Sequence, residues 1–225
     1  IVSRDWSSDV CSSDLAVVTG AGRMFVAGAD IREFNMTRPD DVPELHDMIK
    51  GIEDSPKPVV CAINCLALGG GLELSMGCHY RLIAKGAQVG QPEVNLGFIP
   101  GAGGTQRLPR LIGIDAAMDM ILGGAPISAE KAVALGVADE LVDGDIVARA
   151  IALAEEKAQS GGPRPTGART DKLGGWDSAK FVEARKKAAG LARGVEHFTT
   201  AVDCIEAAAT DRKSTRLNSS HVKRS

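Results

Sequence analysis

The segment AINCLALGGGLEL, residues 62–74, organises the chain around it. Its apolar half belongs to an uninterrupted run that begins at Val59, and such a run predicts a buried parallel strand over Val59–Leu68. Three glycines follow immediately, and Leu72–Cys78 predicts a helix that begins on them. Because no side chain covers the first N–H groups of such a helix, this turn can hold a phosphate or a developing oxyanion.

Two glutamates lie beside glycine-rich turns. Glu73 lies in the first turn of the predicted helix, and Glu93 lies in the next such segment, GQPE at residues 90–93. Glu93 is the only acid between Glu73 and Asp115, and a carboxylate among Gly, Pro and aliphatic residues tends to have a raised pKa. Each also fits a plain role, Glu73 as a helix-dipole partner and Glu93 as an exposed loop residue. Together they favour a two-carboxylate acid–base site.

A third segment, FVAGAD at residues 25–30, gives a weaker signal. Gly28 lets a ligand approach the backbone closely, and Ala29 can offer a second N–H group to the same oxyanion. Other catalytic and binding motifs do not match the sequence. The candidate dinucleotide-binding motif lacks its third glycine, and the segment around Ser75 lacks the first glycine of a nucleophile elbow. The cysteines and histidines lack the spacing of metal ligands, so no metal site is expected.

The remaining pattern alternates strands with helices, which predicts an α/β domain with parallel strands. A linker rich in Gly and Pro is expected at Ser160–Gly175. We expect strands at Ala16–Thr19, Tyr80–Ala84, Ala87–Gly90 and Gly136–Val142, and helices at Pro39–Ser55 (with Asp40 or Asp41 as cap), 115–122, 128–135, Gly144–Ser160, Ser178–Arg193 and Glu196–Ala209.

The composition narrows the class of protein. The chain has 225 residues, of which 44% are hydrophobic and 4% aromatic, with a net charge of -3. No basic block is interleaved with aromatic residues, which disfavours nucleic acid as a partner. No apolar run reaches the roughly 18 residues of a membrane span, and no secretory signal is recognised. Five cysteines without framework spacing favour a reducing compartment.

The two ends of the chain are related through the genetic code. One nucleotide string that encodes Asp211–His221 also encodes Asp5–Leu15 when its reverse complement is translated in another frame. We therefore expect residues 1–15 and 211–225 to derive from a sequencing adapter, with native sequence only between them. The alternative is a pair of ordinary polar tails.

Three motifs occur in the order and spacing of a known family. FVAGADI (25–31), AINCLALGGGLEL (62–74) and GQPEVNLGFIPGAGGTQRLPRLIG (90–113) resemble the crotonase superfamily, and within it the enoyl-CoA hydratases. The later residues are similar to the segment after the hydratase half of bifunctional fatty-acid β-oxidation enzymes, which continue into an NAD-dependent 3-hydroxyacyl-CoA dehydrogenase. The resemblance implies a crotonase-like core at 16–159, the linker at 160–175, and a helical segment at 176–210 that leads toward a missing dehydrogenase half.

The family implies an α/β crotonase spiral of ββα units, here lacking its first strands and followed by C-terminal helices. Ala29 and Gly70 would supply the two N–H groups of an oxyanion hole. Glu73 would help activate a water for attack at C3, and Glu93 would exchange the proton at C2. The further substrate-binding residues that the resemblance implies are Ala27, Gly28, Asp30, Gly69, Gly71, Pro100 and Gly101. Cys65 departs from the family, which usually has glycine there.

The implied function is hydration of trans-2-enoyl-CoA to 3-hydroxyacyl-CoA in fatty-acid β-oxidation. Coenzyme A would enter as part of an acyl-CoA thioester substrate, no cofactor would act in this chain, and NAD would belong to the missing half. A homo-oligomer is compatible with the family.

Two alternatives to this function stay open: an enoyl-CoA isomerase, which needs one acid–base group where this chain has two, and a truncated CoA-binding module without catalysis. The composition fits a bacterial cytoplasm, and a eukaryotic origin would imply a peroxisome.

Overall fold

The computed structural model describes residues 15–22, 24–28, 43–191 and 196–210. Asp40 and Asp41, expected as helix caps, and Ala29 and Asp30, expected at the site, lie outside these residues. Within the described ranges, no helix combines the length and the apolar character that a membrane span requires. No group of three His, Cys, Asp or Glu side chains in the same ranges is placed to hold a metal ion.

Two small sheets form the strand part of the molecule. The larger contains β1 (Ala16–Thr19), β2 (Val59–Ile63), β4 (Tyr80–Ala84) and β7 (Glu140–Val142), all parallel and in that order. The smaller contains β3 (Leu66–Leu68), β5 (Gln88–Gly90) and β6 (Ile127–Ser128), with β3 parallel and β6 antiparallel to β5. The successive strands β2–β3 and β4–β5 therefore enter different sheets before a helix follows, which is the expected ββα repeat.

The expected single strand over Val59–Leu68 is wrong, because the chain turns between β2 and β3 at Asn64 and Cys65. Asn64 holds this turn: its Nδ2 donates to two glycine carbonyls that follow β1, at 3.3 and 3.0 Å. The Cys65 carbonyl accepts a hydrogen bond from Gln88 N at 3.3 Å, which aligns β3 with β5. Hydrophobicity alone does not show such a turn, since apolar residues continue through both strands.

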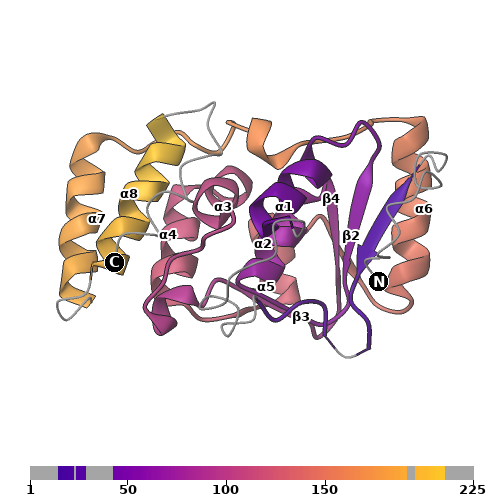
Figure 1. Ribbon diagram of the computed structural model, residues 1–225, viewed down its shortest axis with the longest axis horizontal. Helices are drawn as coiled ribbons and strands as arrows, with labels where there is room; N and C mark the ends of the chain where they lie inside the picture. Colours follow the sequence, from indigo (N-terminus) through magenta and orange to yellow (C-terminus); the bar gives the residue numbers. More distant parts are fainter. Residues whose placement is uncertain (1–14, 23, 29–42, 192–195, 211–225) are drawn as a thin grey trace.

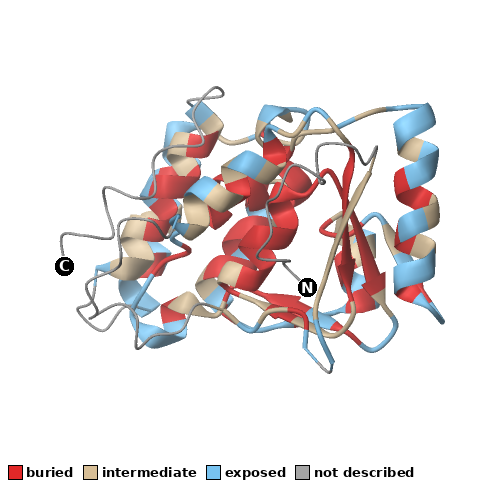
Figure 2. Cartoon of the chain, turned by 45° about the vertical axis from the view of Figure 1, so that its right-hand side comes forward, coloured by how far each residue is buried: buried red, intermediate tan, exposed pale blue. Residues whose placement is uncertain are grey.

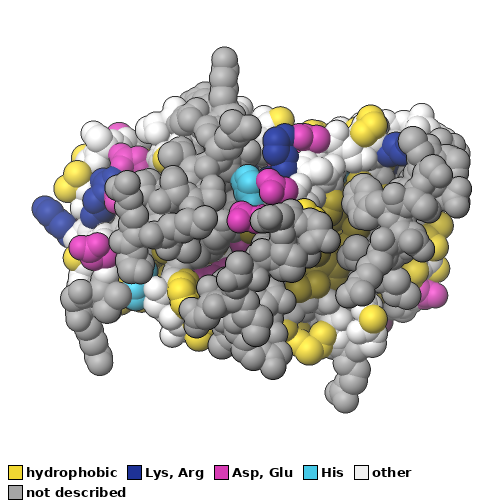
Figure 3. Space-filling model, viewed as in Figure 1, with side chains coloured by type: hydrophobic (Ala, Val, Ile, Leu, Met, Phe, Trp, Pro, Cys, Tyr) yellow, Lys and Arg dark blue, Asp and Glu magenta, His cyan; other side chains and the backbone are white. Residues whose placement is uncertain are grey.

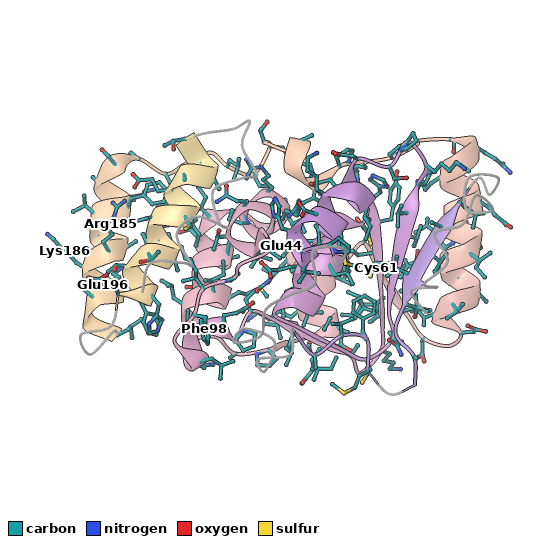
Figure 4. The ribbon with its side chains drawn as sticks, in the orientation of Figure 1. Glu44, Cys61, Phe98, Arg185, Lys186 and Glu196 are labelled. Carbon is teal, nitrogen blue, oxygen red and sulfur yellow. The ribbon has the colours of Figure 1, made fainter. Side chains whose placement is uncertain are left out.

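Helices cover both faces of the larger sheet (Figure 1). α6 (Ile146–Gln159) packs on one face, against a cluster that includes Val60 and Leu82. α1 (Leu45–Glu53) and α2 (Gly70–Gly77) lie on the other face, toward which Cys61 points from β2 (Figure 4). The two faces follow from the alternation of side chains along a strand. α2 and the middle strands form the most buried part of the molecule (Figure 2).

Several boundaries differ from the sequence-based expectations. α2 begins at Gly70 rather than at Leu72, so two of the three glycines are helical. The expected strand over Gly136–Val142 is limited to β7, and the expected helix over Pro39–Ser55 is limited, within the described residues, to α1. The remaining helices in this part are α4 (Ile114–Gly123) and α5 (Ala129–Leu135).

One helix was not predicted at all. α3 (Gly104–Ile112) follows the second glycine-rich segment and contains Pro109. A proline inside a helix removes one backbone hydrogen bond, and a glycine start is not a helix signal. All nine residues of α3 are nevertheless buried, so tertiary packing outweighs the poor local propensity.

The last two helices pack back onto the core. α7 (Ser178–Leu191) and α8 (His197–Thr210) lie side by side, and α8 contacts α3 and α4 (Figure 1). Gln106 Nε2 donates to the Cys204 carbonyl at 2.7 Å across the α3–α8 contact. The segment expected as a linker contains a short 3-10 helix, η4 (Thr166–Ala168), in which the Thr166 side chain is fully buried. Residues 166–168 therefore contact the core directly.

Candidate active site

The start of α2 presents backbone N–H groups at the edge of the core. Gly69, just before the helix, has a φ of 54°, and a Cβ there would lie 3.0 Å from Glu93 Oε1. Gly70 is the first helical residue, so its N–H group has no acceptor within the helix. No side chain of the described residues caps this helix end. The Gly70 N–H and the helix dipole are therefore available to an oxyanion.

Glu73 lies in the first turn of α2, and two backbone donors hold its carboxylate. Its side chain is buried, and Oε1 accepts hydrogen bonds from Ala102 N at 2.8 Å and Gly104 N at 2.7 Å. Ala102 lies in the turn that leads into α3, and Gly104 is the first residue of that helix. A Cβ on Gly104 would lie 2.9 Å from the same oxygen, so a larger residue at this position would crowd the carboxylate. The start of α3 therefore fixes a side chain that belongs to α2.

Glu93 begins the 3-10 helix η3 (Glu93–Leu96), and its carboxylate reaches the start of α2 at Gly69. The Gln91 amide is oriented by its hydrogen bonds: with its nitrogen toward Glu93 it donates to both carboxylate oxygens, at 2.8 and 3.0 Å. The backbone N–H of Phe98 donates to the Glu93 carbonyl at 3.0 Å and closes the turn. Glu93 is thus held from its own segment, whereas Glu73 is held from another.

Both carboxyl groups have raised pKa values. Burial raises the pKa of Glu73 to about 7, although the N–H groups of Gly104 and Ala102 and the charge of Arg107 act in the opposite direction. Burial raises the pKa of Glu93 to about 8, and the negative charge of Glu73 adds to this effect. Because the two carboxylates repel each other, they lose their protons one after the other. A base and an acid therefore coexist in this site near neutral pH.

A backbone segment near the N-terminus runs beside the glycine turn. Leu68 N donates to the Val26 carbonyl at 3.1 Å, which places Ala27 and Gly28 next to the end of β3. A Cβ on Gly71 would lie 2.0 Å from the same Val26 oxygen, so only glycine allows this approach. Three predicted substrate-binding residues, Ala27, Gly28 and Gly71, therefore come together at this end of α2.

The remaining predicted site residues divide into two groups. Pro100 and Gly101 precede the turn that holds Glu73; Pro100 is buried and Gly101 is exposed. Ala29 and Asp30 lie outside the described residues, so Gly70 is the one member of the predicted oxyanion pair whose position can be stated.

Apolar side chains are exposed in the segment that follows Glu93. Leu96 and Phe98, in η3 and just after it, have exposed fractions of 62% and 44%. Phe98 lies left of the middle in Figure 4, whereas the hydrophobic side chains that Figure 3 shows right of the middle lie over the region where α2 meets the strands. A few polar groups beside apolar side chains are typical of sites for small organic molecules.

Sequence reasoning missed four residues of the site. Gln91 and the N–H groups of Ala102 and Gly104 lie inside segments that the sequence singles out, but nothing in the pattern assigns them to Glu93 or Glu73. Nothing in the sequence indicates that Arg107 belongs to the site, since a charged residue is expected at the surface. The glycines at 103 and 104, which admit the backbone close to other groups, are the one local feature that could have indicated the turn.

A family model described as enoyl-CoA hydratase/isomerase matches residues 11–165. The "Probable enoyl-CoA hydratase" of Bacillus subtilis strain 168 is 42% identical over 165 residues, covering 67% of this chain and 63% of that protein. A crystal structure of an enoyl-CoA hydratase from Bacillus anthracis superposes with a TM-score of 0.60 at 34% identity, covering 86% of this chain and 73% of that one.

Longer proteins match as well. The "Peroxisomal bifunctional enzyme" of Homo sapiens is 50% identical over 139 residues, which are 62% of this chain and 19% of that protein. The chain therefore spans about a fifth of the length of the bifunctional relatives it matches.

Proposed function

Because this chain belongs to the enoyl-CoA hydratase/isomerase family, we propose that it adds water to a trans-2-enoyl-CoA and forms a 3-hydroxyacyl-CoA. The observation that carries the proposal is the pair of Glu73 and Glu93. Two largely buried carboxyl groups with pKa values of about 7 and about 8 interact at the start of one helix. An isomerase needs a single acid–base group, whereas hydration uses two.

The two carboxyl groups divide the proton transfers of hydration. Glu73 is the base, because two backbone N–H groups donate to its carboxylate and favour the ionised form: it takes a proton from the water while the water oxygen bonds to C3. The electrons of the C2=C3 double bond move onto the thioester carbonyl and form an enolate. Glu93 is the acid, because burial and the negative charge of Glu73 raise its pKa and favour the protonated form: it delivers its proton to C2 as the enolate collapses. A proton then moves from Glu73 back to Glu93 through water, which restores the starting state.

The enolate oxygen carries the negative charge that must be stabilised. In the proposed complex it accepts a hydrogen bond from Gly70 N–H, at the positive end of the α2 dipole. One such donor contributes about 3 kcal/mol to lowering the barrier. Gly70 needs no motion to donate, because the helix already fixes its N–H group.

The proposed substrate is an acyl-CoA thioester. Addition of water is not a redox reaction, so the step as written uses no electron carrier, and coenzyme A enters as part of the substrate. The exposed apolar side chains of Leu96 and Phe98 beside Glu93 support a place for the acyl chain.

The test is crotonyl-CoA hydration by the chain and by Glu93→Gln, followed through loss of the conjugated enoyl absorbance. The amide cannot deliver a proton to C2, so we expect a loss of about 1,000-fold or more, with binding of coenzyme A nearly unchanged. Glu155→Gln is the matched control, because Glu155 is exposed on α6 and should leave the rate unaltered.

Full activity of Glu93→Gln would overturn the two-glutamate assignment. A chain that converts 3-enoyl-CoA to 2-enoyl-CoA and does not hydrate crotonyl-CoA would replace the proposal with the isomerase alternative.

A further inference from the structure

A buried ion pair lies behind the turn that holds Glu73. Arg107 of α3 and Glu53 at the end of α1 have exposed fractions of 1% and 6%, and Arg107 Nη2 donates to Glu53 Oε2 at 2.7 Å. Arg107 Nε donates to the same oxygen at 3.2 Å. The pair joins two helices that are 54 residues apart in sequence.

The same arginine also binds the turn itself. Arg107 Nη1 donates to the Ala102 carbonyl at 3.1 Å, and the N–H of Ala102 donates to Glu73 Oε1 at 2.8 Å. One residue of the turn therefore connects the guanidinium on one side with the carboxylate on the other. The fit is close, since a Cβ on Gly103 would lie 2.1 Å from Arg107 Nη1.

Glu53 is anchored independently of Arg107. Its Oε1 accepts a hydrogen bond from the N–H of Gly167, in η4, and its backbone carbonyl lies 3.1 Å from His79 Nε2. His79 Nδ1 in turn accepts from Val59 N at 2.9 Å, so its Nε2 carries the proton and donates to Glu53. Glu53 is thus held by η4 directly and by β2 through His79, and both elements lie outside the turn that Arg107 binds.

We propose that Arg107 and Glu53 are positioning residues for Glu73: the guanidinium holds the backbone of Ala102 by its carbonyl, and the N–H of the same residue holds the carboxylate that activates water. The inference rests on the proposed function. Arg107 is suited to this task because its planar fork binds a carboxylate and a carbonyl at once, which the single ammonium of a lysine does not do in the same geometry.

The charges of Arg107 and Glu53 also act on the pKa of Glu73. Among the described residues, the charged groups that face Glu73 are Glu93 from η3 and Arg107 from α3, and Arg107 is itself faced by Glu53 from α1. The charge of Arg107 lowers the pKa of Glu73. Removing Arg107 therefore raises the pKa of Glu73, whereas removing the charge of Glu53 leaves Arg107 uncompensated and lowers it further.

The experiment compares Arg107→Met, Arg107→Lys and Glu53→Gln with the unmodified chain, below the melting temperature of each. We expect kcat for crotonyl-CoA hydration to fall on the order of 100-fold in Arg107→Met, because a displaced catalytic group costs about that much, while KM changes little. Arg107→Lys should recover part of the loss. The pKa of Glu73, followed by carbon-13 NMR of labelled glutamate, should move up in Arg107→Met and down in Glu53→Gln.

Arg81→Met is the matched control for a lost buried arginine. Arg81 is 1% exposed and donates to the carbonyls of Val137 and Cys78 at 2.9 and 2.6 Å and to Thr166 Oγ1 at 3.4 Å, and none of its described bonds reaches Ala102 or Glu53. It should lose thermal stability while kcat of the folded protein and the pKa of Glu73 stay unchanged.

Opposite pKa shifts of Glu73 in the two variants would support the inference even in a chain without hydratase activity, an outcome that would reject the proposed function alone. In a chain that hydrates crotonyl-CoA, equal kcat in Arg107→Met and Arg81→Met would overturn the positioning role, and so would pKa shifts of Glu73 in the same direction in Arg107→Met and Glu53→Gln.

Discussion

Glu53 and Glu73 are both buried glutamates, but different kinds of hydrogen-bond donor hold their carboxylates. Glu53 contacts a guanidinium directly, through two hydrogen bonds from Arg107. Within the described part of the chain, the donors to Glu73 are the backbone N–H groups of Ala102 and Gly104, and burial raises its pKa to about 7. A buried carboxylate that meets a cation is a structural link, whereas one held by neutral donors can exchange its proton near neutral pH.

Removing the structural glutamate should have the largest effect on stability. Glu53→Ala leaves the buried guanidinium of Arg107 without its counter-charge, so we expect the free energy of unfolding to fall by about 3–5 kcal/mol. Urea denaturation followed by circular dichroism measures this loss. A loss under about 1 kcal/mol would mean that the ion pair does not hold α1 against α3.

Removing the carboxyl of Glu73 should change the free energy of unfolding in the opposite direction at high pH. A carboxyl whose pKa is raised from 4.5 to about 7 by folding contributes stability that is fully present below about pH 4.5 and lost as the pH rises through about 7. Glu73→Gln cannot ionise, so we expect it to be more stable than the unmodified chain by ~2 kcal/mol at about pH 9, with the difference vanishing near pH 4.5.

Urea midpoints measured across this pH range test the sign. A destabilised Glu73→Gln at about pH 9 would show that the Glu73 carboxylate is needed for folding, in the same way as that of Glu53.

Breaking a partly exposed ion pair should cause the smallest loss in the free energy of unfolding. Arg149 on α6 donates to Glu140 at 2.8 and 2.9 Å, and the two side chains have exposed fractions of 31% and 38%. Since water and salt screen such pairs, Arg149→Met should cost less than about 1 kcal/mol in the same urea experiment. A cost equal to that of Glu53→Ala would remove burial as the explanation of the difference.

The features that could be predicted from sequence are local ones. The glycine turn, the helix with Glu73 and the strand Tyr80–Ala84 follow from short patterns, and the structure contains them. The break at Asn64 and the helix α3 could not be predicted, because the first depends on bonds to glycines after β1 and the second on packing that outweighs Pro109.

For the site, the two glutamates could be singled out, but not their surroundings. The donors to Glu73 come from residues about 30 positions later in the chain, and the partner of Arg107 lies 54 positions earlier. Such contacts depend on how helices pack, and no spacing rule within one segment encodes them.

The pH dependence of kcat/KM for crotonyl-CoA tests most directly whether Glu73 and Glu93 act as base and acid. We expect a bell-shaped profile that rises through about pH 7, where Glu73 ionises, and falls through about pH 8, where Glu93 loses its proton. A rate that stays constant across both values would contradict the assignment of the two roles.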